Sequence, residues 1–190
     1  MKWLVLLWVL LPVRLAAQDM ALEYYSRCVG PAYEQQAVAK YENLSCRLTQ
    51  SCAPFDPSDF AGQIETDCVS ISVEICLVLD EPDTCVAGVI EKLRMRTQDV
   101  ASGFPISRVE AAARGKESLL ARSLMLQLER SQEVLSGTAA DLCPTAAEIR
   151  LFESFGVEEE ALCHLREASF QSRIVYQIKA RTLELEALDE

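Results

Sequence analysis

The eight cysteines are the residues of this chain whose side chains could do the most chemistry. Seven residues separate Cys68 from Cys76, and eight separate Cys76 from Cys85. Structural zinc sites and redox centres usually have two cysteines with only two residues between them. Because the count is even, four disulfides account for all the cysteines without a metal or another cofactor. The residues concerned are Cys28, Cys46, Cys52, Cys68, Cys76, Cys85, Cys143 and Cys163.

The beginning of the chain predicts export to an oxidising compartment. Segment 1–17 has a positive Lys2, an apolar run over residues 3–11 and the small residues Ala16 and Ala17, which is the pattern of a secretory signal cleaved near Gln18. The apolar run is shorter than the about 20 residues of a membrane span, and an uncleaved interfacial anchor stays open as the alternative. We therefore expect a periplasmic or extracellular protein with oxidised cysteines and no membrane span after cleavage.

Helix geometry excludes one pairing. If residues 63–79 form one helix, Cys68 and Cys76 lie roughly 12 Å apart along its axis. A disulfide needs Cα atoms within about 7 Å of each other. Each of these two cysteines must therefore connect this helix to another segment.

Two other pairs are favoured by their position in the chain. Cys76 and Cys85 flank residues 80–84, a short turn whose base they can close. Cys143 and Cys163 flank a second turn and are the last two cysteines. The pairing of the remaining four stays open, although we expect them to tie the N-terminal helices together. They are Cys28, Cys46, Cys52 and Cys68.

Hydrophobic periodicity predicts an all-α fold. In the last segment of the chain, small and apolar residues recur at gaps of four and three, which is one face of an α-helix. A similar pattern predicts a helix over residues 108–135. Residues 69–75 are the exception, because they alternate and are rich in β-branched side chains, so a strand there is the alternative to the helix that we favour. The stripe in the last helix consists of Ala161, Leu165, Ala168, Ser172, Val175 and Ile178.

Glycine and proline mark the predicted helix ends in the first part of the chain. Gly30-Pro31 ends a first helix, and Pro31 begins a second that runs to about residue 49. Asp56 and Pro57 begin the next helix as its N-cap and first residue.

Capping residues mark the boundaries farther along. Asp83 or Thr84 is expected to cap a helix that runs to Ala101, before Gly103 and Pro105. The sequences from Ser107 to Glu110 and from Thr145 to Glu148 both have the form of a capping box. A helix over residues 146–155 is predicted to end at Gly156, and the last helix to begin near Val157.

These elements divide the chain into three parts. Residues 1–17 are the signal, residues 18–103 form an N-terminal cysteine-rich helical part, and residues 104–190 form a C-terminal helical part that ends in a long helix. Residues 102–107 are the boundary between the two helical parts.

The charge of the chain narrows the classes of partner. The formal net charge is −11, and loss of segment 1–17 would remove Lys2 and Arg14 and no acidic residue. A protein this acidic is not expected to bind nucleic acid or an anionic membrane through bulk electrostatics, and its field attracts basic partners.

Support for catalysis is weak. His164 is the only histidine, and no serine lies in a G-x-S-x-G sequence. A general base needs a positioned nucleophile or acid beside it, and no such pattern surrounds His164. We therefore predict that the protein is not an enzyme and has no metal or cofactor site. The sequence from Asn43 to Ser45 is a glycosylation sequon, which matters only in a eukaryotic secretory route.

The arrangement of the cysteines resembles that of the LprI-type lysozyme inhibitor family, the DUF1311-like exported domains. The resemblance covers roughly residues 60–185. It consists of a C-x7-C segment at Cys68 and Cys76, and of Cys85 at the beginning of a helix. Its late pattern falls on Cys163, Leu165, Ser169 or Ser172, and Arg173.

The chain departs from the family pattern in two places. Members usually carry a tryptophan and an arginine before the penultimate cysteine, and residues 132–142 contain neither. The segment from Leu93 to Arg96 stands where members have a Leu-Asn pair. The resemblance implies a small exported helical domain that is stapled by disulfides. Some members of the family bind and inhibit lysozyme. The two departures leave the implied fold unchanged and concern the surface that would bind a ligand.

Together these observations predict an exported, acidic, disulfide-rich protein-binding module, with lysozyme inhibition as the function that the resemblance implies. A basic lysozyme is then the expected protein partner, blocked by a protruding loop at residues 53–59, 80–84 or 104–107. The acidic residues favoured for binding are Asp80, Glu81 and Asp83, for which a plain helix-hairpin turn is the alternative role. The alternative function is a structural or scaffolding protein of the cell envelope.

Overall fold

The computed structural model describes residues 19–30, 57–135, 143 and 145–188. Within these ranges the chain is all-α and contains no strand, as predicted. Residues 19–28 form the first described helix. The predicted signal, the second helix, the sequon at Asn43, and Cys46 and Cys52 lie outside the described residues. The labelled helices are α3 (Pro57–Cys76), α4 (Pro82–Ser102), α5 (Ile106–Ala113), α6 (Leu119–Leu135), α7 (Ala146–Glu153) and α8 (Glu159–Ala187).

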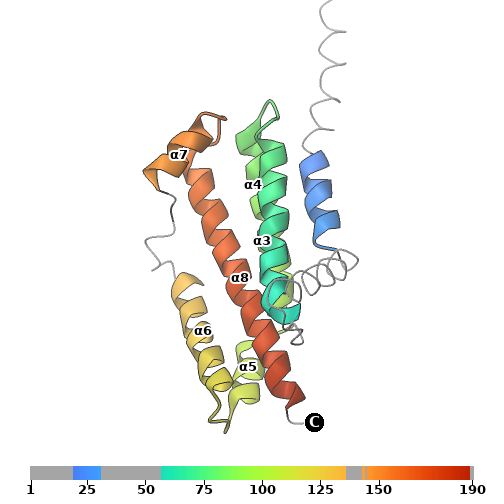
Figure 1. Ribbon diagram of the computed structural model, residues 1–190, viewed down its shortest axis with the longest axis vertical. Helices are drawn as coiled ribbons and strands as arrows, with labels where there is room; N and C mark the ends of the chain where they lie inside the picture. The colour runs from blue at the N-terminus through green and yellow to red at the C-terminus, as the bar shows by residue number, and fades with distance from the viewer. Residues whose placement is uncertain (1–18, 31–56, 136–142, 144, 189–190) are drawn as a thin grey trace, which may run out of the picture.

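The long helix α8 is the axis of the molecule. It runs the length of the bundle, with α3 and α4 beside its upper half, α6 along its lower half, α5 at the lower end and α7 at the upper end (Figure 1). The six residues of the predicted stripe are all buried or half-buried. Ile174, Tyr176 and Thr182, which lie off that stripe, are buried as well. Because other helices pack on both sides of α8, more of its circumference is covered than one amphipathic face would require.

Two hydrophobic clusters share this helix. One cluster joins residues 19–30, α3, α4 and the beginning of α8, with Val86, Val89 and Leu93 fully buried. The other joins α5, α6 and the second half of α8 around Val109 and Leu124, which are also fully buried. Since α8 contributes to both clusters, it connects the two halves of the sequence mechanically.

Residues 69–75 are helical, so the strand alternative is wrong. Val69, Ser72, Val73 and Cys76 are buried, at gaps of three, one and three residues, as one face of a helix requires. A strand would have placed Ile71 on the same face as Val69, yet Ile71 is 36% exposed. The buried Ser72 hydroxyl donates a hydrogen bond to the Cys68 carbonyl at 2.7 Å, so this polar residue is accommodated within the helix.

Several helix boundaries agree with the prediction. The first helix ends before Gly30, and α3 begins at Pro57. The Thr145 hydroxyl accepts from the Glu148 N–H while the Glu148 carboxylate accepts from the Thr145 N–H, so the predicted capping box is confirmed. These hydrogen bonds hold the pKa of Glu148 below its ordinary value. Helix α7 ends at Glu153, two residues earlier than predicted, and Gly156, with φ of +81°, lies beyond it in the left-handed region that favours glycine.

Two predicted caps are wrong. Helix α4 begins at Pro82 with Glu81 as N-cap, so neither Asp83 nor Thr84 caps it. Proline is favoured at the first helical position because it has no N–H to satisfy there. Helix α5 begins at Ile106 after Pro105, which leaves Ser107 inside the first turn and no capping box at residues 107–110.

The single helix predicted for residues 108–135 is wrong as well. The chain leaves α5 at Arg114, whose backbone is extended, and Gly115 has φ of +74°. Helix α6 then begins at Leu119, where the Ser118 hydroxyl accepts a hydrogen bond from the Ala121 N–H at 3.1 Å. The break lets α5 and α6 pack against each other and on α8 instead of continuing in one direction. The last helix begins at Glu159, two residues later than predicted.

Three disulfides connect described cysteines. The favoured pairs Cys76–Cys85 and Cys143–Cys163 are both present. Cys68 pairs with Cys28 across 40 residues, so it connects α3 to the first helix and not to Cys76, as helix geometry required. The fold is therefore a disulfide-stapled bundle of helices.

Candidate functional site

The turn between α3 and α4 is held in one conformation by local bonds. The Leu77 N–H donates to the Val73 carbonyl at 3.0 Å, and the Leu79 N–H to the Cys76 carbonyl at 3.0 Å. The disulfide from Cys76 to Cys85 closes the base of the turn, and both cysteines are buried. A turn fixed in this way loses little conformational entropy when a partner binds it.

The same turn is packed against the beginning of α8. The Asp83 carboxylate accepts a hydrogen bond from the Glu158 N–H at 3.0 Å. Pro82 lies so close to Gly156 that a Cβ on the glycine would be 3.2 Å from the proline Cγ. The acidic residues before α4 and those at the start of α8 therefore lie side by side at one end of the molecule.

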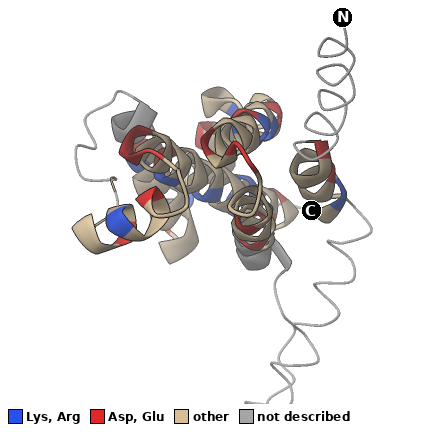
Figure 2. Ribbon diagram, turned by 90° about the horizontal axis from the view of Figure 1, so that it is seen from above, with Lys and Arg blue, Asp and Glu red and all other residues tan. Residues whose placement is uncertain are grey.

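We call this region the acidic end. It is seen face-on in Figure 2, where red segments mark the α3–α4 turn and the adjacent helix starts. Asp80 and Glu81 are exposed, whereas Asp83 is half-buried and caps α8. The sequence predicted all three as binding residues. In the structure Asp80 and Glu81 are available at the surface, whereas Asp83 accepts a hydrogen bond from the start of α8. The acidic end consists of Asp80, Glu81, Asp83, Glu158, Glu159 and Glu160.

Exposed apolar side chains accompany these acidic residues, and the sequence analysis missed them. Val78, in the same turn, is 80% exposed. Leu151 and Phe155, on and just after α7 at the same end of the bundle, are also exposed. Isolated exposed apolar residues are common, but one at the tip of a rigid turn is well placed to enter a partner's pocket. The apolar run of residues 75–79, continuing past the end of the helix, was the available signal.

Of the other two predicted loops, the structure describes one in full and only the end of the other. Residues 57–59 belong to α3, and the earlier part of the first loop lies outside the described residues. The second loop is short because α5 begins at Ile106, and the Arg108 guanidinium lies 4.4 Å from the centre of the Phe104 ring. Of the two predicted loops that are described in full, the α3–α4 turn presents exposed acidic side chains, whereas residues 104–107 form a short connection between two helices.

His164 lies beside the acidic end in a cluster of charged groups. Its Nε2 is 3.6 Å from Glu160 and its Nδ1 is 3.6 Å from Glu167. Arg94 approaches both the Glu167 carboxylate, at 3.5 Å, and the His164 ring, at 3.4 Å. These side chains are all well exposed, so the contacts are those of a solvated ion-pair cluster.

A buried polar network joins the first helix to α3, α4 and α8. Glu65 is 3% exposed, and its carboxylate accepts hydrogen bonds from the Tyr25 hydroxyl and, at 3.0 Å, from Arg96 Nε. Arg96 also donates to the Tyr176 hydroxyl at 3.1 Å and to the Val29 carbonyl at 2.8 Å. The Arg96 charge neutralises the buried carboxylate, as a buried acid requires.

Burial and the negative charge of Glu65 raise the pKa of both Tyr25 and Tyr176 well above the ordinary value. In the unfolded chain these phenols ionise near pH 10. Above that pH the unfolded state binds fewer protons than the folded state, so stability is lost as pH rises. The network therefore favours the folded state at neutral pH and weakens under alkaline conditions.

We expect the free energy of unfolding to fall above about pH 10, by up to about 1.4 kcal/mol per pH unit for each of the two tyrosines. Tyr25→Phe should remove one of these contributions and make the fall less steep. Urea unfolding followed by circular dichroism, between about pH 9 and about pH 11, measures the slope for both proteins. An equal slope in the variant would show that Tyr25 ionises normally in the folded protein.

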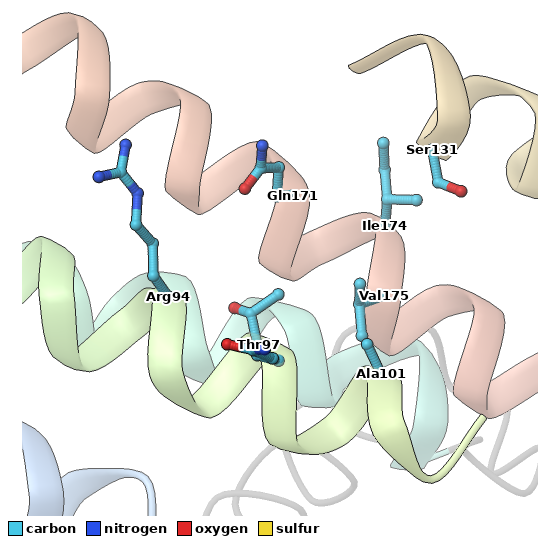
Figure 3. Close-up of a pocket in the computed structure, with 8 residues that line it drawn as sticks. Arg94, Thr97, Ala101, Ser131, Gln171, Ile174 and Val175 are labelled. Atoms are coloured by element: carbon cyan, nitrogen blue, oxygen red, sulfur yellow. The ribbon is translucent and has the colours of Figure 1, made fainter. Parts of the chain in front are cut away.

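A groove runs between α4, α6 and α8, with a volume of about 410 Å³ (Figure 3). Ala101, Ile174 and Val175 make part of its surface apolar, and Ser131 of α6 lies across from α8. Its charged residue is Arg94, which is already paired with Glu167. Thr97, Ser131 and Gln171 also line the groove, but each of these side chains already donates a hydrogen bond within its own helix, so we place no function there.

Neither a metal centre nor a membrane span emerges from the part of the chain that is described. Within residues 19–30, 57–135, 143 and 145–188, no three His, Cys, Asp or Glu side chains gather in a way that could hold a metal ion. None of the described helices combines the length and the apolar character needed to cross a bilayer.

Comparison of the chain with protein-family models, with curated proteins and with solved structures finds no match.

Proposed function

We propose that this protein is an exported protein-binding module that recognises basic proteins through its acidic end, and that a lysozyme is its target. The rigid, exposed turn that presents Asp80 and Glu81 beside Val78 is the observation that carries this proposal. The resemblance of the cysteine arrangement to LprI-type inhibitors supplies the choice of lysozyme. Three disulfides among the described cysteines support maturation in an oxidising compartment.

The charge distribution supports recognition of a basic surface. Glu158, Glu159 and Glu160 place three exposed carboxylates next to the turn, and they are part of the net charge of −11. Complementary fields accelerate encounter and orient the partner, and their effect falls as salt is added. A basic enzyme would therefore approach with its positive surface towards this end.

Val78 offers a partner an apolar contact in addition to the charged contacts of the turn. Protein interfaces place well-packed side chains at the centre and polar groups at the rim. At the α3–α4 turn an exposed valine lies two residues before Asp80 and three before Glu81. In the proposed complex, Val78 enters the cleft of the enzyme while the carboxylates contact basic residues at its edge.

The direct test is a titration of the oxidised protein, without segment 1–17, into lysozymes of several types. Wall lysis is followed at low and at high salt. Inhibition that weakens as salt rises is the expected result. If no lysozyme is inhibited, the lysozyme target is wrong, and binding to isolated peptidoglycan and envelope proteins then tests the scaffolding alternative.

Neutralising the turn should weaken inhibition. For Asp80→Asn with Glu81→Gln we expect the concentration for half-inhibition to rise about tenfold at low salt, because each exposed ion pair contributes at most about 1 kcal/mol. The measurement is the inhibition curve at low and at high salt, where the difference should shrink.

A matched control lies at the opposite end of the bundle. Glu110 and Glu117 are exposed residues of α5 and of the turn after it (Figure 1). Glu110→Gln with Glu117→Gln changes the net charge equally and should leave inhibition within about twofold of the unaltered protein. Equal loss in the two double variants would mean that net charge, and not the acidic end, attracts the partner.

A further inference from the structure

The three described disulfides differ sharply in accessibility. Cys28, Cys68, Cys76 and Cys85 are all at most 5% exposed. Cys143 is exposed and its partner Cys163 is half-buried. Thiol–disulfide exchange requires an attacking thiolate to reach one of the two sulfurs. A reductant can approach the Cys143–Cys163 bond directly, whereas it reaches the other two only when the core opens.

The accessible disulfide holds a weakly packed element. Helix α7 contains no buried residue, and Phe152 is its half-buried contact with the first hydrophobic cluster. Glu148 of α7 faces Arg166 of α8 at 3.5 Å, with both side chains nearly half exposed, so this pair contributes little. Just before α7, Cys143 is bonded to Cys163 of α8, and just after it Gly156 adopts a left-handed turn.

Helix α7 forms one wall of a groove between α3 and α8. The groove has a volume of about 510 Å³. Val73 of α3, Leu77 just after it and Leu165 of α8 line the groove, together with Glu148 and Phe152 of α7. Displacement of α7 would remove Phe152 from this groove and expose the apolar side chains beneath.

We propose that the Cys143–Cys163 disulfide is a redox-sensitive strap, which a dithiol reductant opens while the other two described disulfides stay closed, releasing α7 from the α3–α8 groove. One thiolate of the dithiol attacks the sulfur of Cys143, the exposed residue of the pair, and the Cys163 thiolate leaves. The second thiol of the reductant then displaces Cys143 and closes a disulfide in the reductant. Two electrons and two protons pass to the protein, which gains two thiols. This device is independent of the function proposed above.

The first experiment is a timed reduction of the folded protein with limiting dithiothreitol, followed by alkylation and peptide mapping. Cys143 and Cys163 should be alkylated together, at least about tenfold faster than the four buried cysteines, since an opening cost of 1.4 kcal/mol already gives that factor. Equal or faster labelling of Cys28, Cys68, Cys76 or Cys85 would overturn the proposal. Alkylation of Cys46 and Cys52 is measured on separate peptides and is left out of the comparison.

The second experiment tests release of α7. Hydrogen exchange is measured on the selectively reduced and alkylated protein and on Cys143→Ser with Cys163→Ser. Amides of α7 should exchange at least about tenfold faster in both than in the oxidised protein, with those of α5 unchanged.

A control variant separates the disulfide from the ion pair. Arg166→Gln removes the contact with Glu148, and also the hydrogen bond that Arg166 donates to the Cys143 carbonyl at 3.4 Å, but it leaves the disulfide in place. Its α7 should exchange as slowly as in the unaltered protein. Unchanged α7 exchange after reduction, or fast exchange in Arg166→Gln, would show that the disulfide does not act as the strap.

Discussion

Replacing both Cys28 and Cys68 by alanine is expected to lower the free energy of unfolding by about 4 kcal/mol. The disulfide joins residues 40 apart, and closing a loop of that length removes about this much chain entropy from the unfolded state. Both cysteines are also buried among the side chains of the first hydrophobic cluster, so small cavities add to the loss. Urea unfolding of the double variant, followed by circular dichroism, measures the change.

The disulfide of the acidic turn provides the comparison. Cys76 and Cys85 are only nine residues apart, and the same chain-entropy model gives about 2.5 kcal/mol for their bond. Cys76→Ala with Cys85→Ala should therefore destabilise the protein less than Cys28→Ala with Cys68→Ala. If the order were reversed, loop length would not be what governs the contribution of these disulfides.

Arg96→Met should be the most damaging single substitution in the polar network, lowering the free energy of unfolding by about 3 kcal/mol. It leaves the carboxylate of Glu65, whose side chain is 4% exposed, without its balancing charge. It also removes the donor to the Val29 carbonyl, which connects α4 to the end of the first helix. About a third of the Arg96 side chain is exposed, so we place the effect at the lower end of the range for buried pairs.

Arg94 provides a matched control two residues away on the same helix. Its contact with Glu167 is 3.5 Å long and solvated at both ends. Arg94→Met should therefore lower the free energy of unfolding by less than about 1 kcal/mol. Adding Glu65→Gln to Arg96→Met should recover part of the loss, because a neutral amide is easier to bury than an unpaired carboxylate. If Arg94→Met and Arg96→Met were equally destabilising, burial of Glu65 would not explain the effect.

The Cys28–Cys68 disulfide and Arg96 both attach the first helix to the rest of the bundle. The first helix is held to the bundle by the Cys28–Cys68 bond and by the hydrogen bonds from Tyr25 to Glu65 and from Arg96 to Val29. Their energies should not simply add, because residues that share a network are coupled. The triple variant with Cys28→Ala, Cys68→Ala and Arg96→Met would show the size of that coupling.

Local patterns in the sequence predicted the helical fold class, and the order of the cysteines favoured two of the disulfides that the structure contains. Periodicity marks α8 from Ala161 to Ile178, and the Thr145–Glu148 capping box marks the start of α7. The Cys76–Cys85 pair follows from local information too, because its two cysteines flank one short turn. Features of this kind depend on residues within a few turns of one another, so their physical cause can be seen in a short stretch of sequence.

The sequence also contained the break between α5 and α6, although the pattern alone did not reveal it. Gly115 marks the position, but an isolated glycine inside a helical pattern is often tolerated. What requires the break is the packing of Val109 and Leu124 into the same cluster on α8. Tertiary contact, and not local preference, decides between one long helix and two short ones.

Only the tertiary structure decided which distant residues meet. Cys68 pairs with Cys28, Glu65 meets Arg96, and Asp83 caps α8 at Glu158 and not its own helix. Asp83 is half-buried because it contacts the start of α8, whereas Asp80 and Glu81 are exposed. In each case several partners of the right chemistry were available along the chain. The choice among them is made by how the helices pack around α8, because burial and hydrogen bonding depend on distances in space that no local pattern specifies.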